Sequence, residues 1–295
     1  MMSVAYKVRH ITHFVYPIPV TVCHNIVCLS PRPDARLKIS CASLIITPQP
    51  TVVTQRCDAF GNVTHVFSIE ESHGELTVKS EANLLITAPV FAAIDPPWEQ
   101  VVAMLDQQID PNWFEASTFR YSSMLVLRDQ AARDFAERVF TPGRPIHEAS
   151  LALTELVNKE FAYKPGVTHV GTNSTEALSN HAGVCQDFAH VMLAALRSLG
   201  IPVRYVSGYL RTMPPKGQAR LIGADQSHAW VSVYMGQDLG WIDLDPTNNM
   251  HALTDHIPIA LGRDYADIAP IRGAFLGGGE SRLTVSVDVE QVSEA

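Results

Sequence analysis

Three separated stretches of this sequence carry side chains that together could perform covalent chemistry. Cys185 lies in GVCQDFAH, His228 in SHAWVSVY and Asp245 in GWIDLDPTNN. A cysteine thiolate is a nucleophile, an imidazole can accept and return its proton, and a carboxylate can orient the imidazole. The three residue types would support acyl transfer through a thioester.

The residues that follow Cys185 predict a helix that begins at this cysteine. Apolar side chains recur at the three- and four-residue spacing of one buried helix face: Phe188, Ala189, Met192, Leu193, Leu196 and Leu199. Gly200 and Pro202 end the helix. Unpaired N–H groups and the helix dipole in its first turn favour a thiolate and could bind an oxyanion. Asp187 is expected to point away from Cys185, and His190 to lie on the helix surface or behind the site. The alternative for Cys185 is a small buried core residue.

The other two stretches predict a β-hairpin that brings a histidine and an aspartate together. Residues 227–235 alternate as a half-buried strand, and residues 241–245 form the returning strand. A two-residue turn at 236–237 would place glycine where a type II′ turn prefers it. That register sets Asp245 directly opposite His228, with Cβ atoms about 4.5–5.5 Å apart. A loop one residue longer would move Asp245 to the other face, so the pairing depends on the register.

The three stretches resemble the core motifs of bacterial transglutaminase-like proteins, a family often described as cysteine proteases. The opening at 6–16, YKVRHITHFVY, resembles the amino-terminal domain that accompanies this core. The segment 262–267, GRDYAD, resembles the stretch that follows it. The resemblance implies a Cys-His-Asp triad in which Cys185 is the nucleophile, His228 the general base and Asp245 the orienting carboxylate.

The distribution of strand and helix patterns predicts an α+β protein with two domains. Residues 1–92 show strands and turns without a helical period, which predicts an N-terminal antiparallel β-sandwich. Residues 93–295 carry helical patterns at 126–140 and 146–161. The resemblance implies that they form a transglutaminase/papain-like α+β core, with a C-terminal β-strand at 282–289.

Three segments are expected to lack regular structure. Residues 168–182 form a polar loop that leads the chain to the cysteine, and residues 250–280 are irregular. Residues 211–226 are interpreted as one wall of the substrate cleft, with a plain surface loop as the alternative.

Three further residues are candidates for the oxyanion hole or the substrate cleft: Tyr163, Gln186 and Trp230. The backbone N–H of Cys185 would supply one oxyanion donor. The resemblance implies a second, side-chain donor upstream of the cysteine. Tyr163, in the F-x-Y segment, is the candidate, and a core aromatic residue is the alternative.

Composition limits the classes of partner. The chain has 22 basic and 30 acidic residues, a net charge of −8 and no basic run, which argues against nucleic acid as a partner. No apolar stretch approaches the roughly 18 residues that a membrane helix needs. The first residues also lack the apolar region of a signal peptide, so a cytoplasmic location is expected. The four other cysteines are expected to be buried thiols without zinc-site spacing: Cys23, Cys28, Cys41 and Cys57. No metal and no cofactor is expected.

The expected function is a cysteine peptidase or amidase that cleaves a peptide or isopeptide amide bond in a peptide or protein. A cross-linking transglutaminase, a protein-glutamine gamma-glutamyltransferase, would use the same three residues with an amine as acceptor. Water is the more abundant acceptor and no second pocket is evident, which favours hydrolysis. A non-catalytic binding module on the same fold is a third possibility, against which the complete Cys-His-Asp set argues.

Two aspartates of the returning strand share a face, and a mutation experiment separates them. Asp245→Asn should lower turnover by about 10²–10⁴-fold with the fold retained, because the general base loses its orienting carboxylate. Asp243→Asn should keep turnover within about tenfold, a difference near 1.4 kcal/mol in barrier. Rate measurements and circular dichroism of both variants test this. The reverse order would give Asp243 the orienting role.

Overall fold

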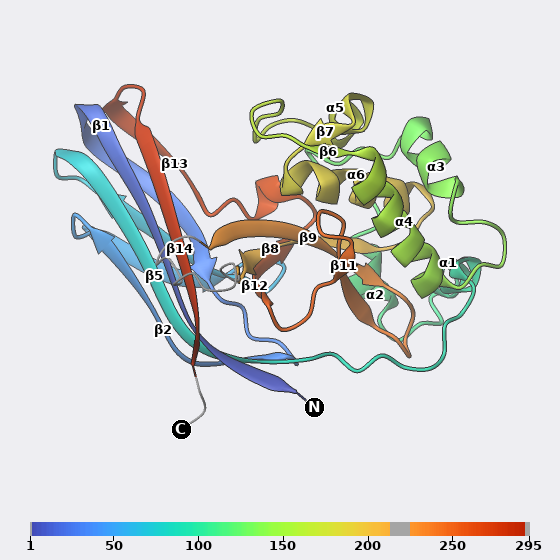
Figure 1. Cartoon of the computed structure of the whole chain (residues 1–295). Coiled ribbons are helices and arrows are strands. Elements are labelled where there is room, and N and C mark those ends of the chain that lie inside the picture. Colours follow the sequence, from blue (N-terminus) through green and yellow to red (C-terminus); the bar gives the residue numbers. More distant parts are fainter. Residues whose placement is uncertain (1, 213–224, 293–295) are drawn as a thin grey trace, which may run out of the picture.

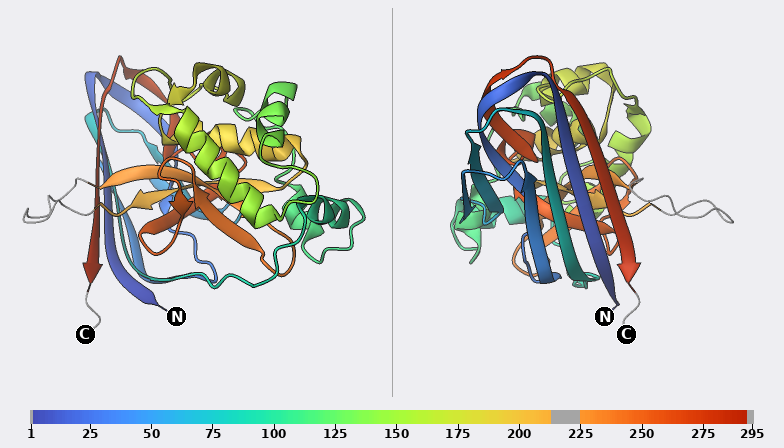
Figure 2. Two further views of the ribbon diagram at one scale, coloured as in Figure 1. Left: turned by 45° about the vertical axis from the view of Figure 1, so that its right-hand side comes forward. Right: turned by 90° about the vertical axis from the view of Figure 1, so that its left-hand side faces the viewer.

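The computed structural model describes residues 2–212 and 225–292, and packs a long antiparallel sheet beside an α+β unit (Figure 1). Helices cover the side of the α+β unit that lies away from the long sheet (Figure 2). The predicted α+β class is therefore confirmed.

The first part of the chain forms five antiparallel strands in the spatial order β2-β5-β1-β4-β3. The strands are β1 (Ser3–Ser30), β2 (Leu37–Thr47), β3 (Val52–Cys57), β4 (Val63–Ile69) and β5 (His73–Thr87). Pro17 and Pro19 interrupt the pairing of β1, because proline has no N–H for the ladder. Its first half pairs with β5 in continuous register up to Val15, and its second half pairs with β4 from Cys23 onward.

The two halves of this sheet enclose a hydrophobic core. Buried side chains from both halves contribute to it: Tyr16, Val20, Cys23, Val27, Leu29, Phe67, Ile69, Leu76 and Val78. The predicted antiparallel layers of the N-terminal part are thus two halves of one sheet, joined by β1.

The end of the chain returns to the N-terminal sheet. Strands β13 (Ile271–Gly278) and β14 (Arg282–Val292) both pair antiparallel with β1, and Figure 1 shows them running beside it. The strand predicted at 282–289 is confirmed, and it joins the sheet of the first domain rather than the core. The prediction that 250–280 is irregular is wrong, because this segment contains β13 and the core strand β12.

The α+β unit consists of six helices, a five-stranded sheet, a short parallel strand pair and a 3-10 turn, among the described residues. The helices are α1 (Trp98–Asp106), α2 (Trp113–Ser117), α3 (Gln130–Glu137), α4 (Ile146–Glu160), α5 (Ser174–Asn180) and α6 (Cys185–Ser198). The sheet follows the order β11 (Met250–His251), β10 (Trp241–Asp245), β9 (Gln226–Tyr234), β8 (Val203–Leu210) and β12 (His256–Gly262). The parallel pair is β6 (Ala162–Tyr163) and β7 (Ala182–Gly183), and the 3-10 turn is η1 (Tyr265–Asp267).

Helix α3 differs from its predicted bounds, and the prediction that 168–182 lacks regular structure is wrong, because this segment contains α5. The pattern at 126–140 yields the shorter α3, because the Asp129 side chain accepts a hydrogen bond from Ala132 N and caps the helix there. The segment 168–182 contains α5, which Asn173 caps in the same way. The N-terminus of each helix is set by a capping residue, which the spacing of apolar residues alone does not identify.

Helix α6 is the central element of this unit. It packs against β8 and β9, with α3, α4 and α5 around it. All its residues from 186 to 198 are buried, so the helix is covered on every side rather than on the one predicted face. Two of its buried polar side chains bond to backbone groups of the core: His190 Nε2 accepts from Tyr265 N, and Arg197 donates to Val203 O and Arg263 O.

Strand β9 is also buried on both faces, whereas its alternation predicted one exposed face. Ala229 and Val231 pack with α6 in the main core. Trp230, on the opposite face, is fully buried with Val206 and Ala252. The Trp230 face is covered by residues of the core itself, and Arg36 of the N-terminal part lies 3.8 Å from Asp243, which bonds the indole.

A shared apolar cluster joins the two parts of the molecule. Tyr209, Ile257 and Ile259 of the core pack against strands β1, β2, β5 and β14. The core sheet therefore rests on the N-terminal sheet.

Gly208 of β8 leaves the space that Trp230 occupies, and its substitution should destabilise the protein. An added Cβ would lie 2.2 Å from Ile257 O and 2.5 Å from Trp230 Cη2. We expect Gly208→Ala to lower the free energy of unfolding by about 1–3 kcal/mol through overpacking. Gly74→Ala is the matched control, because nothing lies within 4 Å of its added Cβ. Equal melting temperatures for the two variants would show that Trp230 and the backbone at Ile257 can both shift at no cost.

Candidate active site

The predicted position of Cys185 as the first residue of α6 is confirmed. Val184 precedes it in extended conformation, and Asp187 reaches back towards this residue. The Asp187 Oδ2 atom accepts hydrogen bonds from Val184 N at 2.7 Å and from Thr168 Oγ1 at 2.7 Å. A Cβ at Gly183 would lie 2.3 Å from the same oxygen, so the glycine leaves room for the carboxylate. Asp187 thus fixes the backbone that carries the cysteine.

The surroundings of the Cys185 thiol suit an anion. The side chain is partly exposed. Among the described residues, the N–H groups of Cys185 and Gln186 have no hydrogen-bond partner. Such free donors at the N-terminus of a 14-residue helix stabilise negative charge.

Strands β9 and β10 bring His228 and Asp245 into contact. The His228 Nε2 atom lies 2.8 Å from Asp245 Oδ2, and both side chains are buried. The predicted contact between these two residues is confirmed.

The register that produces this contact differs from the predicted one by two residues. The hairpin loop spans residues 236–239 instead of a two-residue turn, and Asp243 lies opposite Ser232. Because side chains alternate with a period of two, such a shift leaves both aspartates on the face of His228. Asp245 therefore reaches His228 diagonally rather than from directly across the ladder.

The Asp245 carboxylate is buried and accepts hydrogen bonds from several groups. Besides His228, its Oδ2 accepts from His256 Nε2 at 2.9 Å and from Asn248 Nδ2 at 2.7 Å. Its Oδ1 accepts from Thr247 N at 2.9 Å and Asn248 N at 3.2 Å. Burial acts to raise the pKa of Asp245, but the hydrogen bonds from His228 and His256 outweigh it and hold this pKa well below its usual range. The carboxylate is therefore ionised at neutral pH.

The His228 imidazole interacts with the carboxylate on one side and the thiol on the other. Burial acts to lower the pKa of His228, but hydrogen bonds to Asp245 and Cys185 outweigh it and raise this pKa to about 10. An ionised carboxylate only accepts, so Nε2 carries a proton and Nδ1 is the nitrogen left for the thiol. A histidine with a raised pKa is protonated at neutral pH, and its positive charge stabilises a thiolate.

Asp243 belongs to a different set of contacts. Its Oδ2 accepts a 3.4 Å hydrogen bond from Trp230 Nε1 and lies 3.8 Å from Arg36 Nη1 of the N-terminal part. Burial raises the pKa of Asp243, whereas that of Asp245 is lowered. This geometry makes Asp245 the carboxylate that can orient His228.

Comparison with known proteins identifies the family. Residues 133–246 match the transglutaminase-like superfamily, and residues 6–84 match the bacterial transglutaminase-like N-terminal region. An uncharacterised protein of Mycobacterium tuberculosis is 35% identical over 294 residues, covering 96% of this chain and 92% of that protein. The chain belongs to the transglutaminase-like superfamily.

Two further relatives match to different extents. A protein-glutamine gamma-glutamyltransferase of Pseudomonas aeruginosa is 30% identical over 154 residues, covering 51% of this chain and 22% of that protein. A crystal structure from Cytophaga hutchinsonii, named as a candidate cysteine protease, superposes with a TM-score of 0.79 at 22% identity. It covers 100% of this chain and 93% of the other, so the two share a fold over both parts.

Trp230 of this transglutaminase-like core cannot line a substrate cleft, contrary to the prediction, because its side chain is 0% exposed. Its ring stacks near His228, with centroids 6.2 Å apart, and meets His256 edge-on at 5.3 Å. Trp230 is thus a buried support beneath the histidines.

The other two cleft candidates lie near the cysteine in different environments. The Gln186 Nε2 donates to Val170 O at 3.1 Å, so this side chain holds the preceding loop. Tyr163 is 53% exposed and pairs with Gly183 through the β6–β7 ladder. Burial and the charge of Cys185 raise the pKa of Tyr163. Tyr163 remains the candidate for a side-chain donor.

His256 is a site residue that the sequence analysis missed. It is 11 positions from Asp245 in the sequence and lies in a segment that was predicted to be irregular. No local pattern marks it, because only the pairing of β12 with β8 brings it to the carboxylate.

The His228, His256 and Asp245 side chains are also of types that bind metal ions. One ligand atom from each lies within 4.8 Å of the others. Hydrogen bonds within the cluster already use the two Nε2 atoms and the carboxylate oxygen, so a metal ion would have to displace them. We therefore interpret the cluster as a hydrogen-bond network.

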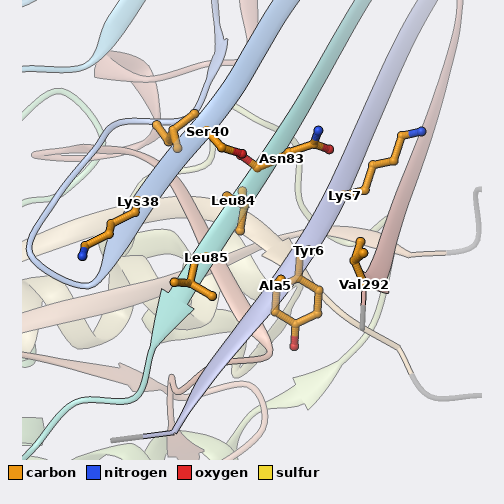
Figure 3. Close-up of a pocket in the computed structure, with 10 residues that line it drawn as sticks. Ala5, Tyr6, Lys7, Lys38, Ser40, Asn83, Leu84, Leu85 and Val292 are labelled. Atoms are coloured by element: carbon orange, nitrogen blue, oxygen red, sulfur yellow. The ribbon is translucent and has the colours of Figure 1, made fainter. Parts of the chain in front are cut away.

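The hollow drawn in Figure 3 offers no comparable chemistry. It has a volume of about 580 Å³ and lies over strands β1, β2 and β5 of the N-terminal sheet. Lys7, Lys38 and Asn83 are among its lining residues, which include no cysteine, histidine or carboxylate.

No helix of the described residues is long and apolar enough to cross a membrane.

The segment 211–226 was interpreted as one wall of the substrate cleft. Most of it lies outside the described residues, so this interpretation stays a prediction.

The five cysteines fall into three environments. Cys23 and Cys28 are buried as expected, but Cys41 and Cys57 are exposed on strands β2 and β3. Access alone therefore cannot single out Cys185, and its reactivity must be recognised from the effect of pH.

We expect the alkylation rate of Cys185 by iodoacetamide to change little between about pH 7 and pH 9, because the His228 imidazolium, with a pKa of about 10, persists over this range. In His228→Ala the rate should rise by up to about tenfold per pH unit, as for an unassisted thiol. Mass mapping after brief treatment measures each site, and Cys41 and Cys57 provide internal controls. A wild-type Cys185 whose rate rises in parallel with theirs would contradict the ion pair.

Proposed function

We propose that this protein is a thiol-dependent acyl-transfer enzyme that hydrolyses amide bonds, as a cysteine peptidase or amidase with a Cys185-His228-Asp245 triad. The observation that carries the proposal is the 2.8 Å hydrogen bond from His228 Nε2 to Asp245 Oδ2, and the influence of Cys185 on the pKa of His228 supports it. Membership of the transglutaminase-like superfamily supports enzymatic activity.

The first half of the reaction forms a thioester. The Cys185 thiolate attacks the amide carbonyl carbon, which forms a C–S bond and places negative charge on the carbonyl oxygen. Collapse of this intermediate breaks the C–N bond, and the amine leaves with the proton of the His228 imidazolium. Asp245 keeps the ring in the orientation that delivers this proton.

The second half of the reaction releases the acid. Water attacks the thioester carbonyl as His228 takes its proton, the C–S bond breaks, and the thiolate and imidazolium are restored. The acyl group leaves as a carboxylic acid.

The oxyanion would be held at the N-terminus of α6. The free N–H groups of Cys185 and Gln186 are the main-chain donors available there. The Tyr163 hydroxyl is the proposed side-chain donor, since it is exposed and senses the charge of the thiol. Preorganised donors of this kind stabilise a developing oxyanion more than the ground-state carbonyl.

A cross-linking transglutaminase is the second candidate, favoured by the match to the Pseudomonas aeruginosa protein-glutamine gamma-glutamyltransferase. Both activities share the thioester and differ only in whether water or an amine resolves it. The triad residues themselves do not discriminate between these acceptors.

The proposal predicts release of free acid with little amine incorporation. A glutamine-bearing peptide is incubated with the protein and a fluorescent amine, and the acid, ammonia and labelled peptide are quantified. Hydrolysis should exceed labelling, and Cys185→Ala should reduce both to background because no thioester can form. A panel of electrophilic peptides identifies the modified residue. Labelling in excess of acid release would favour the transglutaminase, and turnover that survives in Cys185→Ala would refute both candidates.

A further inference from the structure

Asp245 receives hydrogen bonds from two imidazoles, and the mechanism above uses only one of them. His256, the first residue of β12, is 2% exposed, and its Nε2 lies 2.9 Å from Asp245 Oδ2. The same oxygen accepts a hydrogen bond from His228 Nε2 at 2.8 Å. Two rings on two different strands therefore meet at one carboxylate oxygen.

The hydrogen-bonding capacity of the carboxylate determines what His256 does there. Because ionised Asp245 can only accept, His256 must present a protonated Nε2 to it. Together with Asn248 Nδ2 at 2.7 Å, this donor adds two hydrogen bonds on Oδ2 to the one from His228. A carboxylate held from several directions cannot rotate away from His228.

The position of His256 is itself determined by its neighbours. It pairs with Leu210 at the end of the β8–β12 ladder, and its ring meets Trp230 edge-on with centroids 5.3 Å apart. Trp230 also stacks near His228, so one indole supports both rings.

We propose that His256 is a positioning residue, which locks the Asp245 carboxylate so that it holds His228 in line with Cys185. The inference rests on the proposed triad and adds a residue that acts through Asp245 rather than on the substrate. The donated hydrogen bond, and not the volume of the ring, is the feature that matters.

Other titratable groups also surround this network. Tyr163 and Tyr205 are close enough to Cys185 to sense its charge, and Asp187 lies at the same helix end. None of these three hydrogen-bonds Asp245, whose donors among the described residues are His228, His256, Asn248 and the backbone N–H of Thr247. Loss of the His256 donor should therefore affect Asp245 first.

The test compares His256→Phe, which removes the donor, with His256→Gln, which keeps an N–H donor of similar reach. Turnover of p-nitrophenyl acetate should fall about tenfold or more in His256→Phe through kcat, with KM little changed, and recover largely in His256→Gln. The alkylation rate of Cys185 at pH 7 should also fall in His256→Phe, because a carboxylate that is no longer held in place stabilises the His228 imidazolium less well. His73→Phe, at a buried histidine of the N-terminal sheet, is the matched control.

Several outcomes would overturn the proposal. One is a His256→Phe variant, folded by circular dichroism, with wild-type kcat and alkylation profile. Another is an equal loss in His256→Gln, which would make packing rather than the donor responsible. A third is stoichiometric metal in the purified protein whose removal by chelation changes Cys185 alkylation, which would make His256 a metal ligand. Failure of the triad itself is recognised separately, as a wild-type protein whose Cys185 shows no enhanced alkylation.

Discussion

The buried charge of Asp245 is the constraint on which the site depends. An unpaired carboxylate in a protein interior carries a large desolvation penalty, so it persists only with several donors. Here the donors come from β9, from β12 and from the turn after β10. The three segments must be in place together for the carboxylate to remain ionised, so the electrostatics of His228 depend on the assembled sheet.

The N-terminal part supports the core sheet beside the site. Its strands pack on Tyr209, Ile257 and Ile259, and Arg36, just before β2, lies 3.8 Å from Asp243. Strands β13 and β14 extend this sheet from the other end of the chain. The region that contains the site is thus enclosed by both ends of the sequence, and the two parts behave as one packed structure rather than as separate modules.

Asp243 and Asp245 lie on one strand but differ in pKa and in role, because their surroundings differ. Asp243 and Asp245 share a face, yet burial raises the pKa of Asp243 whereas histidine donors lower that of Asp245. Asp187 has a third task, because it accepts hydrogen bonds at the start of α6 and holds the backbone before Cys185. The three carboxylates are chemically identical, so their different roles follow from the hydrogen-bond donors that surround each of them.

Local patterns in the sequence determined α6, the hairpin strands and the face shared by His228 and Asp245, because helical and strand periods are encoded by neighbouring residues. They did not determine the loop at 236–239, which depends on backbone conformation, although an even shift preserved the face. The burial of Trp230, the return of β14 to β1 and the arrival of His256 at Asp245 were decided only by the tertiary structure. These contacts join residues far apart in the chain, and the free energy that selects them comes from packing the whole core rather than from any local segment.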